Sequence, residues 1–290
     1  MSTILQVKDL THTYNADTPL TKTALKNISF SVEKGEIVGI IGHTGSGKTT
    51  LVGHLNGLLK PTSGEIIVDG KNIWDDPKKI SKIRSLVGLV FQYPEYQLFE
   101  ETVYKDIAFG PKNLGLSGQE LDNRIRETCK AVNIKEDLLF KSPFDLSGGE
   151  KRRVAIAGVM AMLPKILVLD EPVAGLDPAG RNSVIKMIED YRDTYNATVM
   201  IVSHNMENMA QIADKLLVMN KGELYMYDST ENVFKRGEKL REIGLNVPIV
   251  TRVVDVIRQK GIDIPDNIFT VESAVEYITS KSQKAGGLDA

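Results

Sequence analysis

A glycine-rich run in the first fifth of the chain has the residue types and spacing needed to hold a phosphate. Its pattern is G-x-x-x-x-G-K-[ST], carried by Gly42-His43-Thr44-Gly45-Ser46-Gly47-Lys48-Thr49. An apolar run precedes it and a helical pattern follows it, so the backbone N–H groups and the helix N-terminus can face phosphate oxygens. Lys48 is expected to reach the β- and γ-phosphates, and the Thr49 hydroxyl to bind Mg²⁺. The run therefore predicts an ATP site, to which we also assign Thr50.

Two adjacent acids supply the second half of this chemistry. Asp170 and Glu171 directly follow the apolar run Ile166–Leu169. A carboxylate at the end of a buried strand suits Mg²⁺ held through water, which is the role expected for Asp170. The next residue points the other way, so Glu171 is expected to polarise the water that attacks the γ-phosphate. Taken alone, the pair also fits an acidic cap of the following helix.

A third motif indicates the kind of ATPase. Leu146-Ser147-Gly148-Gly149-Glu150 precedes a helical pattern in which Ser147 can cap the helix while the two glycine amides face a phosphate. Here the sequence resembles the ATP-binding-cassette (ABC) family, whose signature is L-S-G-G-Q. The resemblance implies a head-to-tail dimer in which this signature contacts ATP on the partner's phosphate loop. Glu150 departs from the family pattern, and its carboxylate is expected to weaken nucleotide affinity slightly without abolishing it.

The resemblance assigns roles to four more residues, which stand in the family's order along the chain. Gln92 resembles the Q-loop glutamine, a ligand of Mg²⁺ and water. Asp177 lies in Ala174-Gly175-Leu176-Asp177, which is similar to the D-loop at the dimer interface. His204 resembles the switch histidine at the γ-phosphate, and Tyr14 the aromatic residue that stacks on adenine. Together these motifs span about residues 4–235.

Several stretches are similar to one branch, the ATPases of energy-coupling factor (ECF) transporters. They are the phosphate loop itself, His54–Leu59, the segment 88–111 and Ala155–Gly158. Arg152-Arg153 resembles the second, A-prime, paralogue. The resemblance implies three partners: a paralogous ABC ATPase forming a heterodimer, a transmembrane coupling subunit, and a substrate-binding membrane subunit for vitamins or other micronutrients. It places the chain at the cytoplasmic face of the cell membrane as a peripheral protein.

The stretch after Gln92 is expected to form the groove for the coupling subunit. Its apolar members are Tyr93, Tyr96, Leu98 and Phe99. The acids Glu95 and Glu100, with Glu101, are expected to surround them, and negative charge there would steer the Arg-containing helices that this family's coupling subunit presents.

The elements that must position these residues follow from the apolar pattern. Three apolar runs, near residues 37, 166 and 199, have almost no polar residue, which indicates strands buried on both faces of a mostly parallel sheet. Alternation in the early strands favours a flanking antiparallel sheet. We expect strands at Ile4–Leu10, Ile28–Val32, Glu36–Ile41, Glu65–Val68, Leu86–Phe91, Ile166–Leu169, Thr198–Val202, Lys215–Met219 and Leu224–Tyr227, and helices after Gly47, Gly118, Gly148, Pro178 and Met206.

The predicted fold class is therefore α/β, a P-loop NTPase of the ABC cassette type. It comprises a mostly parallel RecA-like sheet, an antiparallel β subdomain and a helical subdomain over about 92–162. The cassette would occupy 1–235. Residues 236–290 would form a C-terminal extension in which two apolar stripes, starting at Val250 and Val271, mark amphipathic helices. We expect this extension to serve dimerisation, with a loose tail at 280–290.

The composition excludes several classes of protein. The 290 residues carry a net charge of −2 and are 42% hydrophobic and 26% charged, as in globular proteins with a full core. The near-neutral balance argues against a nucleic-acid partner. The single cysteine excludes an internal disulfide. The longest apolar run, Val154–Leu163, is far short of the ~20 residues that cross a bilayer, and the N-terminus has no signal-peptide pattern.

Three other functions stay open at this point. One is the ATPase of a conventional ABC importer or of a cobalt or nickel ECF system. Another is a soluble ABC ATPase outside transport. The sequence lacks the sustained heptads of DNA-repair members and has only one cassette, whereas ribosome-associated members have two. The third is a non-catalytic regulatory subunit, which the presence of both Glu171 and His204 argues against.

Overall fold

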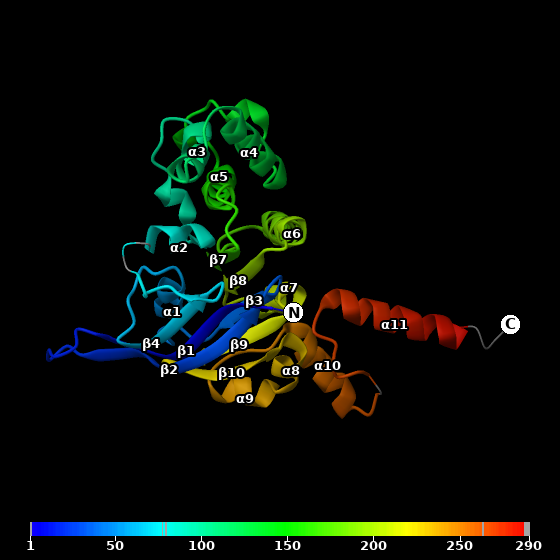
Figure 1. The fold of residues 1–290 in the computed structure, drawn as a ribbon. Coiled ribbons are helices and arrows are strands. Elements are labelled where there is room, and N and C mark those ends of the chain that lie inside the picture. Colours follow the sequence, from blue (N-terminus) through cyan, green and yellow to red (C-terminus); the bar gives the residue numbers. More distant parts are fainter. Residues whose placement is uncertain (1, 77, 79, 263, 287–290) are drawn as a thin grey trace.

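A computed structural model describes residues 2–76, 78, 80–262 and 264–286, the last five of these as backbone only. Its centre is a six-stranded sheet in the order β10-β9-β3-β8-β7-β6 (Figure 1). Neighbours from β9 to β6 are parallel, and β10 is antiparallel to β9. The bounds are β3 Ile37–Ile41, β6 Val87–Val90, β7 Ile166–Asp170, β8 Thr198–Val202, β9 Lys215–Asn220 and β10 Glu223–Ser229. Every residue of β3, β7 and β8 is buried, as their unbroken apolar runs predict.

A second sheet lies against one face of the first. It is antiparallel, in the order β2-β1-β4-β5. Its strands are β1 Thr3–Tyr14, β2 Lys22–Glu33, β4 Ser63–Val68 and the short β5 Lys71–Asn72. Helix α1, Lys48–Leu55, contributes Leu51, Val52 and Leu55 to the apolar core that the two sheets share. The predicted antiparallel subdomain is therefore present, although the sequence pattern did not indicate β5.

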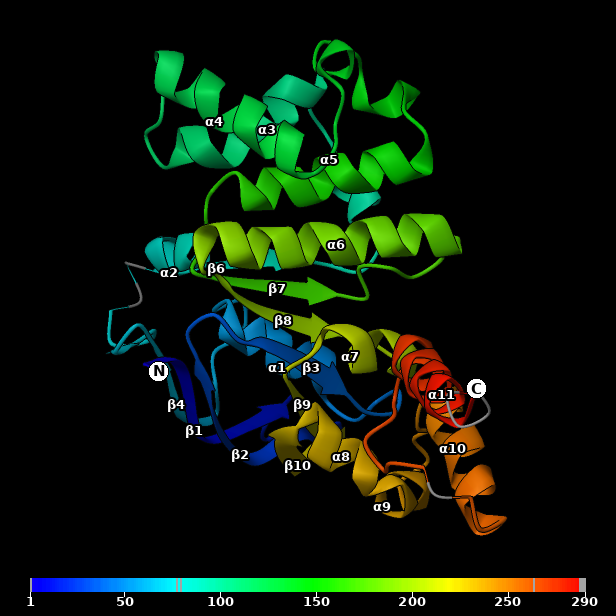
Figure 2. The same cartoon turned by 90° about the vertical axis from the view of Figure 1, so that its right-hand side faces the viewer.

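Helices cover the other face of the central sheet. Helix α6, Pro178–Tyr195, runs along β7 (Figure 2), and α7, Met206–Ile212, and α8, Thr230–Lys235, pack into the same core. This core continues into the helical subdomain, which contains α3, Val103–Asn113, α4, Gly118–Ala131, and α5, Gly148–Met160. The remaining elements here are α2 Ile80–Leu86 and the short 3₁₀ turns η2 Pro94–Gln97, η3 Glu136–Leu138 and η4 Pro143–Asp145.

Helices α2 and α3 were not predicted. Helix α3 contains Pro111, which in a sequence favours a helix end. In the structure the helix is capped by Thr102, whose side chain accepts from Lys105 N, and Pro111 lies buried near its end. Helix α2 is only about two turns long and has no fully buried residue, although Ile83 and Leu86 pack against the core that the two sheets share.

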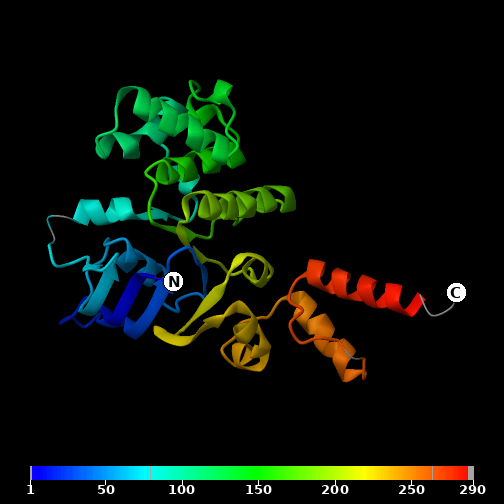
Figure 3. The same ribbon diagram turned by 45° about the vertical axis from the view of Figure 1, so that its right-hand side comes forward.

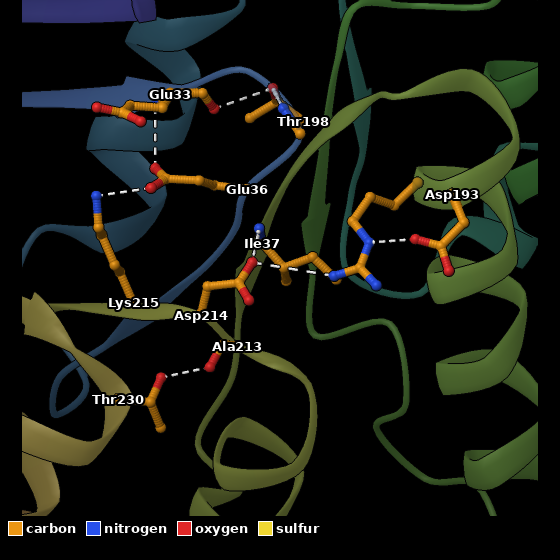
Figure 4. A network of polar contacts seen from close by, with 11 residues as sticks. Glu33, Glu36, Ile37, Asp193, Thr198, Ala213, Asp214, Lys215 and Thr230 are labelled. Carbon is orange, nitrogen blue, oxygen red and sulfur yellow. Dashed lines mark hydrogen bonds and ion pairs between the residues drawn. The ribbon is translucent and has the colours of Figure 1, made fainter. Parts of the chain in front are cut away.

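Polar contacts tie the amino ends of the central strands together (Figure 4). The Glu36 carboxylate accepts from the Glu33 N–H at 2.9 Å and lies 2.6 Å from the Lys215 amino group. The Asp214 carboxylate accepts from the Ile37 N–H at 2.8 Å. This end of the sheet is fastened by its own side chains, whereas the loops that would bind a ligand leave the opposite, carboxyl ends.

The C-terminal extension projects from the cassette (Figure 3). After α9, Gly237–Glu242, come α10, Ile249–Gln259, and α11, Val271–Gly286, the two predicted amphipathic helices. They share a small core of Val254, Ile264 and Ile268 with flanking apolar side chains.

Helix α11 extends past residue 280 to Gly286, into the segment that was predicted to be a loose tail. Residues 287–290 lie outside the described residues.

Candidate functional site

The phosphate loop leaves the carboxyl end of β3 and closes onto α1. Gly42 has φ +156°, and a Cβ there would lie 2.4 Å from the Met219 carbonyl oxygen and 2.6 Å from Ser46 Oγ. Gly47, the N-cap of α1, has φ +106°. A side chain at either position would force the loop away from the neighbouring β9 strand or into backbone strain. The glycines of the motif are thus required by this close approach as well as by a phosphate.

Lys48 lies over this loop. Its amino group donates to the carbonyl oxygens of Gly42, at 2.6 Å, and His43, at 3.0 Å. Burial lowers the pKa of Lys48, and the carboxylates of Glu171 and Asp170 oppose that shift. The cation is therefore positioned beside the acidic pair by the loop's own backbone.

The acidic pair stands at the end of β7, the strand next but one to β3. Asp170 is 7% exposed, and burial raises its pKa while Lys48 lowers it. Burial, together with the adjacent Asp170 charge, raises the pKa of Glu171 to about 7. Glu171 has φ +50°, an uncommon value for a residue with a side chain, and its N–H donates to the Val202 carbonyl at 3.0 Å. Backbone strain of this kind is concentrated at functional sites.

His204 completes the group from the end of β8. Its Nε2 lies 3.4 Å from Glu171 Oε1. Burial lowers the His204 pKa, as does the nearby Lys48 charge. The buried Glu171 Oε1 has no hydrogen-bond partner among the described residues. A carboxylate with an unfilled acceptor oxygen beside an imidazole can also accept a hydrogen bond from a water molecule.

These side chains face one cavity of about 620 Å³. Eleven predicted residues line it: Tyr14, Thr44, Gly45, Gly47, Lys48, Thr49, Thr50, Gln92, Asp170, Glu171 and His204. Residues not predicted also line it, namely Lys22, Thr23, Ala24, Lys26, Lys221 and Gly222. They come from β2 and the β9–β10 turn, and no local pattern marks them because only sheet packing brings them to the loop. Their three lysines add positive charge where a polyphosphate would lie.

Three predicted loop residues do not line the cavity but support it. Gly42 is buried behind the loop, and the Ser46 hydroxyl is buried without a partner among the described residues. The His43 ring bridges two segments: Nδ1 is 2.8 Å from the Thr44 carbonyl oxygen and Nε2 is 3.1 Å from Asn220 Oδ1. His43 therefore fastens the loop to the end of β9.

Tyr14 is held from behind by α1. Its hydroxyl is 3.3 Å from Thr50 Oγ1, and its ring meets the His12 ring edge-on at a centroid distance of 4.5 Å. His12 in turn contacts the His54 ring at 4.5 Å. Both histidines are buried: His12 packs directly against Tyr14, and His54 packs against His12.

The signature segment lies outside this cavity. Ser147 is the N-cap of α5 and forms a reciprocal capping box with Glu150. Nothing lies within 4 Å of the positions where Cβ atoms of Gly148 and Gly149 would stand, so this side of the helix start is open. Asp177 caps α6, accepting from the Gly180 N–H at 2.7 Å. It lines a small cavity that also contains Gly149 of the signature.

A groove of about 780 Å³ runs between α2, α3 and α5. Of the predicted groove residues, Leu98 and Phe99 line it, whereas Tyr93, Tyr96 and Glu100 do not. Phe109 packs edge-on against Phe99 at 5.0 Å. Asp106 and Phe109, which belong to the predicted stretch, also line the groove. Lining residues outside that stretch include Lys82, Arg84, Val159 and Met162.

Glu95 has a different position from the one expected. Its carboxylate accepts from Arg152 Nη2 at 2.8 Å and Nε at 3.1 Å, and the two side chains are 17% and 5% exposed. Although burial opposes it, this guanidinium holds the pKa of Glu95 below its usual range. Glu95 therefore ties η2 to α5 instead of supplying charge to the groove, because a long-range partner neutralises it.

A phosphate loop, an acidic pair on a neighbouring parallel strand and a separate helical subdomain that carries the signature together define the class of an ABC-type ATPase. The model of the ABC transporter family matches residues 25–174. The ATP-binding protein EcfA2 of the energy-coupling factor transporter from Caldanaerobacter subterraneus subsp. tengcongensis is 52% identical over 94% of this chain and 96% of its own. The protein of the same name from Clostridium perfringens is 54% identical, with the same coverage.

Solved structures agree with this class. CbiO1 of Clostridium perfringens, part of the ABC transporter complex CbiONQ, superposes with a TM-score of 0.76 at 37% identity, covering 89% of this chain and 100% of its own. The dimeric bacterial ABC transporter cassette MJ0796 gives a TM-score of 0.70 at 29% identity, covering 78% and 99%. The chain belongs to the ATP-binding proteins of energy-coupling factor transporters. The predicted fold class and family are thus confirmed. No helix in the described part of the chain is both long and apolar enough to span a membrane.

Proposed function

We propose that this chain is one of two cassettes that hydrolyse ATP to drive micronutrient uptake by an energy-coupling factor transporter, through a membrane coupling subunit and a separate substrate-binding membrane subunit. The observation that carries the proposal is the convergence of Lys48, Asp170, Glu171 and His204 on the cavity at the phosphate loop. Family membership supports the transport role.

Each side chain has a task in ATP hydrolysis that follows from its position. The loop amides and Lys48 hold the β- and γ-phosphates, and Tyr14 at the rim stacks on adenine. Glu171, whose pKa is about 7, accepts a hydrogen bond from the attacking water and then takes its proton. A general base works best when its pKa is near the working pH. Lys48 and His204 stabilise the charge that develops on the γ-phosphate oxygens.

The same residues fit Mg²⁺. The exposed Thr49 hydroxyl, the Asp170 carboxylate and the Gln92 amide oxygen all line the cavity, and such oxygen donors suit this ion. When bound, Mg²⁺ would neutralise negative charge on the phosphates.

We place the second cassette, a paralogue, on two surfaces. The open N-terminal side of α5 would meet the partner's ATP through Ser147, Gly148 and Gly149, with Asp177 beside it. The extension supplies the other surface. Its helices pack on each other yet leave apolar side chains exposed by half or more, namely Ile249, Val253, Val256, Val271, Val275 and Ile278. Exposed apolar patches of this kind mark association surfaces.

The groove would receive the membrane coupling subunit. Its walls combine the apolar side chains of Leu98, Phe99 and Phe109 with charged residues of both signs, which suits an amphipathic helix laid into it. Seating there would hold the chain on the cytoplasmic face of the membrane, and closure of the cassettes would move the seated helix.

The test is capture of the tagged chain from detergent-solubilised membranes, followed by ATPase measurements on the complex. We expect a second cassette and integral membrane proteins to co-purify. Glu171→Gln should keep ATP binding and lose turnover at its own site, whereas Glu120→Gln, an exposed acid on α4, should match wild type. Recovery of the chain with only soluble partners would refute the transport role, and full turnover with both cassettes altered would refute the general base.

A further inference from the structure

The hydroxyl of the signature serine is already engaged within this chain. Ser147 Oγ donates to Glu150 Oε2 at 2.6 Å, and the Ser147 N–H donates to the same oxygen at 2.9 Å. In return, the Glu150 N–H donates to Ser147 Oγ at 3.4 Å. The Ser147 hydroxyl holds the pKa of Glu150 below its usual value, so the acceptor is an ionised carboxylate. Hydrogen bonds to ionised groups are shorter and stronger than neutral ones.

Another helix of this chain that begins with the same pattern lacks this contact. Helix α4 begins with the same residue types at the same spacing, Ser117-Gly118-Gln119-Glu120, yet its N-cap Ser117 makes no side-chain capping bond. The sequence pattern S-G-x-E therefore does not by itself engage the serine hydroxyl. At α5 the backbone geometry does so, and the two residues between Ser147 and Glu150 are glycines whose Cβ positions would face open space.

We propose that Glu150 is a positioning residue that attenuates the ATP contact made by this signature, by competing with the partner-bound γ-phosphate for the Ser147 hydroxyl. The inference rests on the proposed function. For Ser147 to donate to a phosphate, it must release Glu150, and the freed carboxylate then stands near a second anion. Glutamine at position 150 would still accept from Ser147 through its amide oxygen but carries no charge, and its N–H₂ can donate to phosphate.

The consequence is an asymmetric pair of ATP sites. The site completed by this chain's signature binds nucleotide more weakly than a site completed by a signature with glutamine. The weakened hydrogen bond stabilises the bound nucleotide and the transition state equally. Its loss should therefore raise KM more than it lowers kcat.

The experiment uses the complex purified through a tag on this chain, with substitutions in this chain alone. In Glu150→Gln we expect KM for ATP to fall roughly threefold to tenfold, as for one charge-assisted hydrogen bond, with kcat within about twofold. Glu120→Gln makes the same charge change at the same position of another helix and should leave KM unchanged. The melting temperature of the Glu150→Gln chain should equal that of wild type, because glutamine also completes a capping box.

A double-mutant cycle separates the mechanism from general electrostatics. If Glu150 acts through the serine, Glu150→Gln should lower KM less than half as much in the Ser147→Ala background as it does with Ser147 present. An unchanged or raised KM in Glu150→Gln, in a complex whose wild type hydrolyses ATP, overturns the inference and leaves the proposed function intact. A wild-type complex without ATPase activity overturns the proposed function, and the inference with it.

Discussion

Removal of one partner from the ion pair between Arg152 and Glu95 should strongly destabilise the helical subdomain. The members of the pair lie on α5 and η2 and are 5% and 17% exposed. Arg152 also donates from Nη1 to the Ala174 carbonyl oxygen, at 2.5 Å. One guanidinium thus joins the segment after Gln92, the signature helix and the loop before Asp177.

Arg152→Met removes the charge and keeps most of the apolar stem. It leaves the Glu95 carboxylate buried without its partner, and breaking a buried pair in this way costs about 3 kcal/mol or more. For a chain of this size, that loss lowers the melting temperature by roughly 6 °C or more. We expect this in thermal unfolding of the purified chain followed by circular dichroism, with a smaller loss in the double variant Arg152→Met/Glu95→Leu, in which no charge is left unpaired.

A matched control is Lys186→Met. Lys186 pairs with Asp190 at 3.3 Å on α6, but its side chain is 74% exposed. Removing such a pair changes stability by less than about 1 kcal/mol. If Arg152→Met destabilises the chain no more than Lys186→Met does, or if the double variant is less stable than Arg152→Met, the reasoning about the buried pair is refuted.

Three further outcomes follow from the site. Because the pKa of Glu171 is about 7, turnover of the complex should rise between pH 6 and pH 8 as the carboxylate ionises, and a flat profile there would contradict the base role. Burial lowers the pKa of His54 from 6.5 to about 4, so its stabilising contribution is complete above pH 6.5 and is lost as the pH falls toward 4. Urea unfolding should show about 2 kcal/mol less stability at pH 5 than at pH 7 from this group, a difference absent in His54→Phe. Gly42→Ala should abolish binding of a fluorescent ATP analogue because its Cβ would meet Met219 and Ser46, whereas Gly45→Ala, with nothing within 4 Å of its Cβ, should bind more weakly than wild type but measurably.

The sequence by itself determined the chemistry and the central sheet. The phosphate loop, Asp170, Glu171 and His204 each stand at the end of a strand that is apolar throughout, and parallel strands bring their carboxyl ends to one edge. Contiguous motifs and unbroken apolar runs are local signals, so they can be identified without knowing which segments meet. The same holds for α10 and α11, whose apolar stripes repeat at helical spacing.

Only the tertiary structure decided which side chains neutralise one another. Glu95 and Arg152 are far apart in sequence, and their pairing converts a predicted groove charge into a buried tie. Lys22, Lys26 and Lys221 reach the ATP cavity because two sheets pack against each other. Ser147 engages Glu150 while Ser117 makes no side-chain capping bond, although both helices begin with S-G-x-E. These outcomes depend on distances between groups that packing sets, and residue types at a given spacing do not specify those distances.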